Sequence, residues 1–394
     1  MTVPPLPQPR AGLASTAAHC PDGLGGTCVY ALSGDSTSAG FVAYSPATSV
    51  WATLPPMKTA RNSLASTTAP CPGGVKGDCV YAIGGAQGNT ALATNEAYST
   101  ETNAWLSLPP MPTPRAAMAA ATAPCPEELG LRGACVYVFG GNSMAVADAI
   151  LTTVEAYSPA TNTWATLPPL RVRRIGHAGA AGTCPEGLGL HGACVYAFGG
   201  LSPDGTLAAA EVYSPVTNAW MDLPDMPTRR GDGLGGAFAP CPDGMADGCV
   251  YALGGLNGTT LDTVEAYSPA ANAWVTLPSM PTPHRELGAA AAPCPKNTRR
   301  SCVYAVGGQT NNSSSDTAVV EAFAIEHTPA KDGTEPKPST SAPEPAPFPA
   351  DGLTDDLLSP VPGGAPPGTV LRDTPPAPPV TGLPYRVPKA NDPS

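Results

Sequence analysis

Residues 249–281 read CVYALGGLNGTTLDTVEAYSPAANAWVTLPSMP, and this stretch decides the fold. Its short runs CVYAL, VEAYS and AWVTL are separated by Gly, Asn, Asp and Pro, a spacing typical of β-strands joined by turns. In the middle run, Val264 and Ala266 point to one face and Glu265 and Tyr267 to the other, as the period of a strand requires. An Ala-rich run that follows an arginine supplies one more strand. The sequence predicts a unit of four short strands.

The same unit occurs six times. The triplet Cys-Val-Tyr returns at intervals of 51 to 59 residues, so the period is close to fifty. A Gly pair follows in every copy except the first, which has Ser33-Gly34. All the tryptophans of the chain fall at one phase of the repeat, at the start of the fourth strand, and are Trp51, Trp105, Trp164, Trp220 and Trp274. We therefore expect the aromatic residues to belong to the scaffold.

Six such sheets need neighbours, because a single four-stranded sheet cannot bury both of its faces. Packing the copies radially buries each sheet against the next and leaves only short edges. The sequence predicts an all-β fold, a six-bladed β-propeller with four-stranded antiparallel blades, over residues 1–327.

The repeat resembles the Kelch repeat of β-propellers, including the central propeller of galactose oxidase. The resemblance rests on the Gly pair that ends strand two, the Tyr on strand three and the Trp that starts strand four, and it covers residues 1–326. Two copies depart from it: the first has Ser33 for a Gly, and the sixth has Phe323 for the Tyr and no Trp after Ala324. A fold of this kind does not by itself specify a function.

The N-terminal segment MTVPPL aligns with the residues that follow the tryptophan in WATLPPM and WMDLPDM. We expect this segment to supply the outer strand of the sixth blade and so to close the ring. On this hypothesis the natural protein extends upstream through a Trp, and Met1 is an internal residue or a misassigned start.

The twelve cysteines form six local pairs, one in each copy. Each pair flanks the turn between strands one and two, where facing Cα atoms lie within reach of a disulfide. Zinc sites use closer spacing, and no His accompanies each pair, so we expect neither a metal nor a cofactor. The predicted disulfides are Cys20–Cys28, Cys71–Cys79, Cys125–Cys135, Cys184–Cys194, Cys241–Cys249 and Cys294–Cys302.

Six disulfides imply an oxidising compartment, so we expect an extracellular, cell-surface or periplasmic protein. No signal peptide is visible in the chain, and reduced structural thiols would instead permit a cytosolic one. The net charge of −11 argues against nucleic-acid binding. No stretch approaches the roughly 18 apolar residues that a transmembrane helix needs.

From Thr328 onward the repeat stops, and 18 prolines occur in 67 residues without apolar periodicity. Such a segment cannot bury a core. We expect residues 328–394 to be a disordered Pro-rich tail.

The candidate ligand-binding residues come from the connections between strand four and the next strand one. In a Kelch-like blade these connections share one face with the connections between strands two and three. We expect arginines there to ring the channel mouth and attract anions. The alternative is that Glu96, Glu155, Glu211, Glu265 and Glu321 neutralise them in ion pairs. The candidates are Arg10, Arg61, Arg115, Arg171, Arg174, Arg230, Arg285, His177 and His284, with Asp232 as a less repetitive neighbour.

These features favour a secreted or cell-surface binding module, monomeric, that presents loops and an Arg-lined channel mouth to a protein, peptide or glycan ligand, possibly an anionic one. The near-identity of the copies argues against catalysis, because an active site needs one asymmetric constellation. The resemblance also leaves a sialic-acid mutarotase-like sugar enzyme, using His284, Arg285 and Glu286. A structural or adhesive surface protein is the third hypothesis.

Overall fold

Blade five shows how the repeat folds. Its strands are β21 (Gly235–Pro240), β22 (Gly248–Leu253), β25 (Val264–Ser268) and β26 (Ala273–Leu277), which pair in that order and antiparallel. Tyr251 lies opposite Ala266, and Tyr267 lies opposite Trp274. The computed structural model describes residues 1, 3–34, 37–145, 149–242, 248–310 and 315–325.

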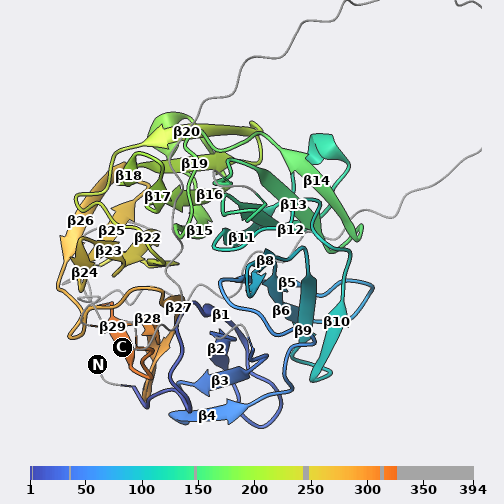
Figure 1. Ribbon diagram of the computed structural model, residues 1–394, viewed down its shortest axis with the longest axis vertical. Helices are drawn as coiled ribbons and strands as arrows, with labels where there is room; N and C mark the ends of the chain where they lie inside the picture. The colour runs from blue at the N-terminus through green and yellow to red at the C-terminus, as the bar shows by residue number, and fades with distance from the viewer. Residues whose placement is uncertain (2, 35–36, 146–148, 243–247, 311–314, 326–394) are drawn as a thin grey trace, which may run out of the picture. The chain divides into compact units, whose positions relative to one another are not determined.

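The other blades repeat this order around a ring (Figure 1). Short two-stranded hairpins extend the connection between strands two and three in three blades, namely β7 (Ala86–Gln87) with β8 (Thr90–Ala91), β17 (Leu201–Ser202) with β18 (Gly205–Thr206), and β23 (Leu256–Asn257) with β24 (Thr259–Thr260). Two 3₁₀ turns, Glu127–Leu129 and Glu186–Leu188, lie between strands one and two of blades three and four. The strands of the remaining blades are β1 (Ala14–His19), β2 (Thr27–Leu32), β3 (Phe41–Ser45) and β4 (Val50–Thr53) in blade one; β5 (Ala65–Pro70), β6 (Asp78–Ile83), β9 (Asn95–Ser99) and β10 (Ala104–Ser107) in blade two; β11 (Ala119–Pro124), β12 (Ala134–Phe139), β13 (Val154–Ser158) and β14 (Thr163–Leu167) in blade three; β15 (Ala178–Thr183), β16 (Ala193–Phe198), β19 (Ala210–Ser214) and β20 (Ala219–Leu223) in blade four; and β27 (Gly288–Cys294), β28 (Asn297–Val306) and β29 (Val320–Ala324) in blade six.

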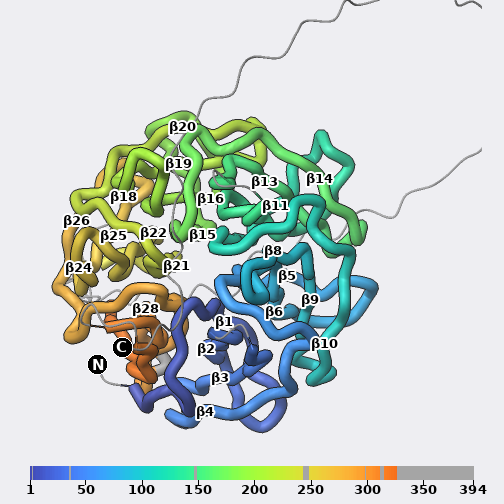
Figure 2. The backbone as a smooth tube through the Cα atoms, viewed as in Figure 1, coloured from blue at the N-terminus to red at the C-terminus, as the bar shows by residue number. Residues whose placement is uncertain are grey.

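The core lies between successive blades. The first strands of successive blades contact one another in a circle around the axis; they are β1, β5, β11, β15, β21 and β27. Figure 2 shows the backbone of the blades arranged around this centre. Space is short there, which accounts for their alanines. Farther out, large rings fill the gap between blades, as where Tyr137 of blade three meets Tyr213 of blade four with ring centroids 5.7 Å apart.

The Gly pair that ends strand two is required by its backbone. Gly254 has φ 58°, and a Cβ added there would lie 2.3 Å from the carbonyl oxygen of His284 in the next connection. The first blade tolerates Ser33 at this place with φ 59°, and the Ser33 hydroxyl donates to the carbonyl oxygen of Arg61. The substitution thus keeps the left-handed backbone and adds a bond between blades.

The N-terminal segment closes the ring, as expected. The Val3 N–H donates to Val320 O at 3.3 Å, the Ala322 N–H donates to Met1 O at 3.0 Å, and both bonds join the segment to β29. The side chains of Val3 and Leu6 are each 3% exposed. The first residues of the chain therefore complete the last blade.

All six predicted disulfides form, each across the hairpin of strands one and two, with Cα atoms 4.9 to 5.0 Å apart. In the part of the chain that the structure describes, no helix has the length and apolarity to cross a membrane. The chain divides into Met1–His327 and Thr328–Ser394. The second unit lies outside the described residues, so the disorder of residues 328–394 stays a prediction.

Candidate functional site

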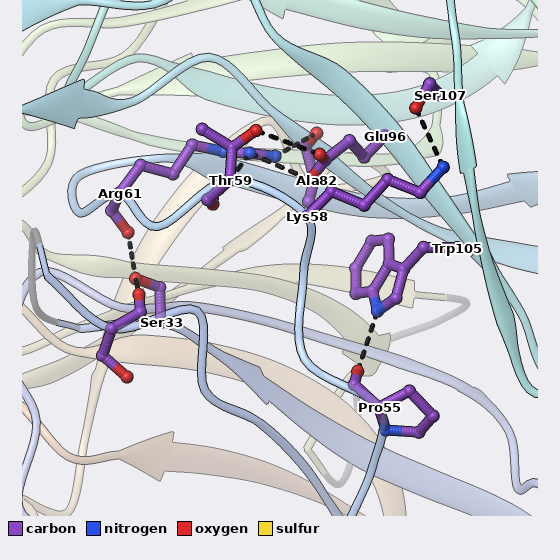
Figure 3. A network of polar contacts seen from close by, with 10 residues as sticks. Ser33, Pro55, Lys58, Thr59, Arg61, Ala82, Glu96, Trp105 and Ser107 are labelled. Carbon is purple, nitrogen blue, oxygen red and sulfur yellow. Dashed lines mark hydrogen bonds and ion pairs between the residues drawn. The ribbon is translucent and has the colours of Figure 1, made fainter.

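Four of the candidate arginines lie inside the blades. Arg61 Nη1 is 2.9 Å from Glu96 Oε2, and its Nη2 donates to the carbonyl oxygen of Ala82 at 2.9 Å (Figure 3). In the other three pairs, Arg115–Glu155, Arg174–Glu211 and Arg230–Glu265, the arginine contacts its glutamate through Nη2 and donates to backbone carbonyls through Nη1. All four arginines are 0% exposed.

Burial lowers the pKa of these four arginines, and each facing glutamate opposes that shift. Each guanidinium group also donates to strand-end carbonyls, as Arg174 Nη1 does to Gly199 O at 2.8 Å and Ala209 O at 3.0 Å. The pairs tie each strand-four-to-one connection to the next blade. A surface ligand cannot reach them without opening a blade, so neutralisation by glutamate describes them better than an Arg-lined channel mouth.

Arg10 of blade one occupies the same position but has no glutamate opposite, because the equivalent third-strand residue is Val42. Its side chain is buried, and Nη1 donates to the carbonyl oxygens of Ser33 and Gly40, each at 3.1 Å. Burial lowers the pKa of Arg10. Arg10 is therefore also a structural residue of the scaffold.

In blade six the position of the buried arginine belongs to His284, not to Arg285. The Arg285 N–H donates to Gln309 O just as the Gly231 N–H donates to Leu256 O, so Arg285 is the equivalent of Gly231. His284 is 0% exposed, with Nδ1 2.8 Å from Gly307 O and Nε2 3.8 Å from Glu321 Oε2. The expectation that Arg285 opens the innermost strand like the other arginines is wrong by one residue.

His177 is also a core residue. It stands where the other blades have Leu or Met, and its ring lies 5.6 Å from that of Phe139. Burial, with a smaller effect of Arg174, holds the pKa of His177 well below its usual value. Neither ring nitrogen has a hydrogen-bond partner among the described residues. His177 is 5% exposed, so its imidazole lies in the core between the blades and not at the surface.

Arg171 is the exposed member of the set. Its side chain is 54% exposed, and Nε lies 2.7 Å from Asp222 Oδ1. An ion pair this exposed to water contributes little to stability.

A closed circle of backbone hydrogen bonds surrounds the axis on the face that carries these connections. Each member lies two residues after the buried Arg or His and has a positive φ, and its N–H donates to the carbonyl of the preceding blade. In blade five the circle passes through two residues, because Asp232 accepts and Gly233 donates. We call this circle the axial ring; its members are Gly12, Ser63, Ala117, Gly176, Asp232–Gly233 and Glu286.

The extra residue in blade five makes one side of the axial ring different from the rest. Asp232 and Glu286 are its two acidic members, and Arg285 Nη1 lies 2.9 Å from Asp232 Oδ2. The Glu286 carboxylate points over blade one, since its Oε2 lies 3.9 Å from where a Gly12 Cβ would be. The half-buried ring thus carries one asymmetric charged group: Asp232, Arg285 and Glu286.

The Glu286 carboxyl is the most perturbed acid of this group. The pKa of Glu286 is raised to about 7, chiefly by burial and also by Asp232 and Asp316, while Arg285 opposes the shift. Three carboxyl groups against one guanidinium make the place attractive to a cation and poor for an anion. The sequence did flag Arg285 and Asp232, but the contribution of Asp316, from the connection between strands two and three, was missed.

No cluster of three or more His, Cys, Asp or Glu side chains suited to a metal ion occurs among the described residues.

Comparison with known proteins agrees with this architecture. Residues 67–112, 133–171, 187–227 and 239–281 match a family model described as the Kelch motif. The protein is a Kelch-repeat β-propeller. Kelch propellers generally serve as protein-interaction modules.

The curated relatives of this Kelch propeller are much longer proteins. Kelch-like protein 23 from Homo sapiens is 31% identical over 182 residues, which are 45% of this chain and 28% of that protein. Kelch-like protein 40 from Mus musculus is 28% identical over 206 residues, 52% of this chain and 28% of that protein. Among solved structures, one titled "Structure of YjhT" aligns with a TM-score of 0.58 at 14% identity, covering 84% of this chain and 98% of that one. At that identity the likeness shows the fold alone.

Proposed function

We propose that the protein is a secreted or cell-surface binding module, monomeric, whose loop face engages a protein or peptide partner and receives a cationic side chain of that partner at the axial ring. The observation that carries the proposal is the half-buried Glu286 carboxyl, with a pKa of about 7, next to Asp232. A bound ammonium or guanidinium group would stabilise the charged form of Glu286.

The preference for a cation replaces the earlier expectation of an anionic ligand. That expectation needed Arg61, Arg115, Arg174 and Arg230 at the surface, and their charges lie within blades beside glutamates. What remains at the axial ring is acidic. A glycan ligand without charge stays compatible with the polar ring, and peptide and glycan arrays probed in parallel separate the two.

The secreted location is supported by the disulfides, because six of them persist only in an oxidising compartment. Intact-mass analysis of the protein from its native source tests this part. We expect the mass to lie below that of the fully reduced chain by one hydrogen for each of the twelve cysteines. Free thiols in the native protein would contradict export.

The ligand chemistry is tested by fluorescence anisotropy with a labelled penta-arginine peptide and a penta-glutamate peptide of equal length. We expect the basic peptide to bind, to bind more tightly as the pH rises from 6 to 8, and to lose affinity about tenfold in Glu286→Gln, near the value of one charge-assisted hydrogen bond.

The matched control is Glu128→Gln, which removes the same charge from an exposed residue of the 3₁₀ turn Glu127–Leu129, between strands one and two of blade three. If Glu128→Gln weakens binding as much as Glu286→Gln, the peptide senses only the net charge, and the proposed site is wrong.

A sugar enzyme of the mutarotase kind is the second candidate. It is favoured by one observation: an acid with a pKa near 7 beside a guanidinium group suits general acid–base chemistry at neutral pH. His284 is buried below the ring, so only Arg285 and Glu286 of the expected trio are available. NMR measurement of sialic-acid anomer exchange, with Arg285→Ala and Glu286→Ala as comparisons, tests it. Exchange no faster than in buffer would exclude this activity.

If neither arrays nor exchange assays give a signal, the third hypothesis, a structural or adhesive surface protein, is favoured.

A further inference from the structure

Arg285 carries a charge at a place in the repeat where the other blades carry none. The residue that directly follows the buried Arg or His exchanges two backbone hydrogen bonds with the connection between strands two and three of the same blade, as Gly231 does with Leu256 and Arg285 with Gln309. Those bonds need only the backbone, so the fold does not require a charged side chain there. Such a departure from a regular pattern marks a functional role more often than a structural one. The residues at this place are Ala11, Asn62, Ala116, Ile175, Gly231 and Arg285.

The carboxyl groups around Arg285 depart from the repeat as well. Asp232 and Glu286 are members of the axial ring, whose other positions hold residues without charge. Asp316 pairs with Gln309, which in turn pairs with Arg285. One cation and three acids are therefore added to the repeat on the same side of the axial ring.

Arg285 is held less firmly than the arginines inside the blades. Its Nη1 lies 2.9 Å from Asp232 Oδ2, and the two side chains are 20% and 31% exposed. Its Nε has no hydrogen-bond partner among the described residues. Arg174, in contrast, is 0% exposed and donates through all three of its guanidinium nitrogen atoms. A partly exposed ion pair contributes little to stability, so another cation can replace Arg285 with only a small loss.

The charge of Arg285 acts on the acids that the proposed site uses. Arg285 lowers the pKa of Glu286, whereas Asp232 and Asp316 raise it. A cation close enough to do so also repels a second cation that approaches the same carboxyl groups. In the free protein, Arg285 therefore occupies the surroundings that a basic group of a partner would need.

We propose that Arg285 is an intramolecular competitor at the axial ring, a residue that pairs with Asp232 and shields Glu286 in the free protein and is displaced when a basic side chain of a protein partner binds. This inference rests on the function proposed above. The competitor belongs to this chain, and the ligand belongs to the partner. Competition of this kind weakens the binding of isolated cations and so favours a partner that makes further contacts with the loop face.

The test compares three variants in the anisotropy assay with the labelled penta-arginine peptide. Arg285→Met removes the competitor, Arg285→Lys keeps its charge, and Arg171→Met removes the same charge from the exposed ion pair with Asp222. At pH 8 we expect Arg285→Met to bind the peptide about fivefold more tightly than the wild type, a gain that corresponds to one exposed ion pair. Arg285→Lys and Arg171→Met should stay within about twofold of the wild type.

The pH dependence separates competition from a structural role. Loss of Arg285 raises the pKa of Glu286 further, so fewer of the Glu286 carboxyl groups are ionised at pH 6. The gain in affinity of Arg285→Met should therefore be larger at pH 8 than at pH 6. If Arg285 only held the connection in place, its loss would weaken binding at both values, and the melting temperature of the variant would fall.

The outcomes distinguish this inference from the proposed function. Peptide binding to the wild type that Arg285→Met leaves unchanged or weakens would overturn the competitor but leave the proposed site standing. An equal gain in Arg171→Met would also overturn it, because the peptide would then sense only the net charge. Binding to Arg285→Met alone would support it. Binding to neither protein would contradict the proposed function, and the competitor with it.

Discussion

At the scale of single residues, the buried arginine of blades one to five shows how a charge is held inside an all-β blade. Arg115 is 0% exposed, and its guanidinium group contacts Glu155, Thr153 O and Gly140 O. Its Nε also donates to Thr113 O at 3.3 Å, so each nitrogen atom of the guanidinium group has an acceptor. Such a guanidinium group holds the connection in place only while its glutamate and carbonyl partners are present, because a buried charge that loses its partner is destabilising.

Removing one member of the set should be costly. Arg115→Met leaves Glu155 charged and unpaired in the interior, so we expect the free energy of unfolding to fall by about 3–5 kcal/mol. The double variant Arg115→Met/Glu155→Leu should lose less. Urea denaturation followed by tryptophan fluorescence measures both.

The matched control is Arg171→Met, which breaks a pair that is largely exposed and should cost less than about 1 kcal/mol. A loss in Arg115→Met no larger than in Arg171→Met would show that the buried pair does not stabilise the blade.

Glu286 gives a second prediction at this scale. Its pKa is raised in the folded protein to about 7 from 4.5, so the folded state holds a proton that the unfolded state has released between these values. The contribution of this residue to stability is therefore lost as the pH rises through that window. Glu286→Gln should match the wild type near pH 4 and exceed it at pH 8, by an amount on the order of 1 kcal/mol after discounting for its partial exposure.

Thermal denaturation from pH 4 to pH 8 gives the profile. Asp232, Asp316 and Arg285 act on the same carboxyl. Arg285→Ala should therefore raise the pKa of Glu286 further and widen the window, whereas Asp232→Asn should lower this pKa and narrow the window. Parallel profiles for Glu286→Gln and the wild type would mean that the acid titrates normally.

At the scale of strands and hairpins, each disulfide joins the two strands of one hairpin. The closed loops are short, with sequence separations of 8 or 10 residues. Chain-entropy arguments give about 2–3 kcal/mol for a loop of this size.

Cys71→Ser/Cys79→Ser should therefore lower the free energy of unfolding by about 2–3 kcal/mol, and the loss should be similar for the corresponding pair in blade five, Cys241→Ser/Cys249→Ser. Calorimetry of the two double variants tests this. A much larger loss of stability in one blade would indicate that its disulfide stabilises more of the protein than the hairpin that it closes.

Strand-level features were the most predictable part of the molecule. Short apolar runs, the Gly pairs and the paired cysteines act through local geometry, so the blades and their disulfides could be predicted from residues such as Gly254 and Cys249 alone. The exposure of Arg61 was not predictable in the same way, because it depends on whether Glu96 of a later strand reaches it. The one-residue shift at His284 and the extra residue at Asp232 could not be predicted either, since both are seen only when the backbone hydrogen bonds of adjacent blades are compared.

At the scale of the whole molecule, closure depends on the N-terminal segment. Val3 and Leu6 are buried against the last blade, and Val3 N–H and Leu6 N–H donate to Val320 and Ala318. Burying side chains of this size contributes roughly 1.5–3 kcal/mol each.

Deleting residues 1–5 should therefore lower the free energy of unfolding by at least about 2 kcal/mol and expose β29. Hydrogen exchange should then increase first at Val320 and Ala322, before the other blades respond. Unchanged protection of β29 after the deletion would show that the ring is held closed by other contacts.

The disulfides also set how the molecule would come apart. Since each bridge links neighbours on a single hairpin, none connects one blade to another. A protease that nicks one connection between blades would leave two fragments joined only by packing and by hydrogen bonds. Such a nicked molecule would keep its shape in buffer but run as two separate bands in detergent even without a reducing agent.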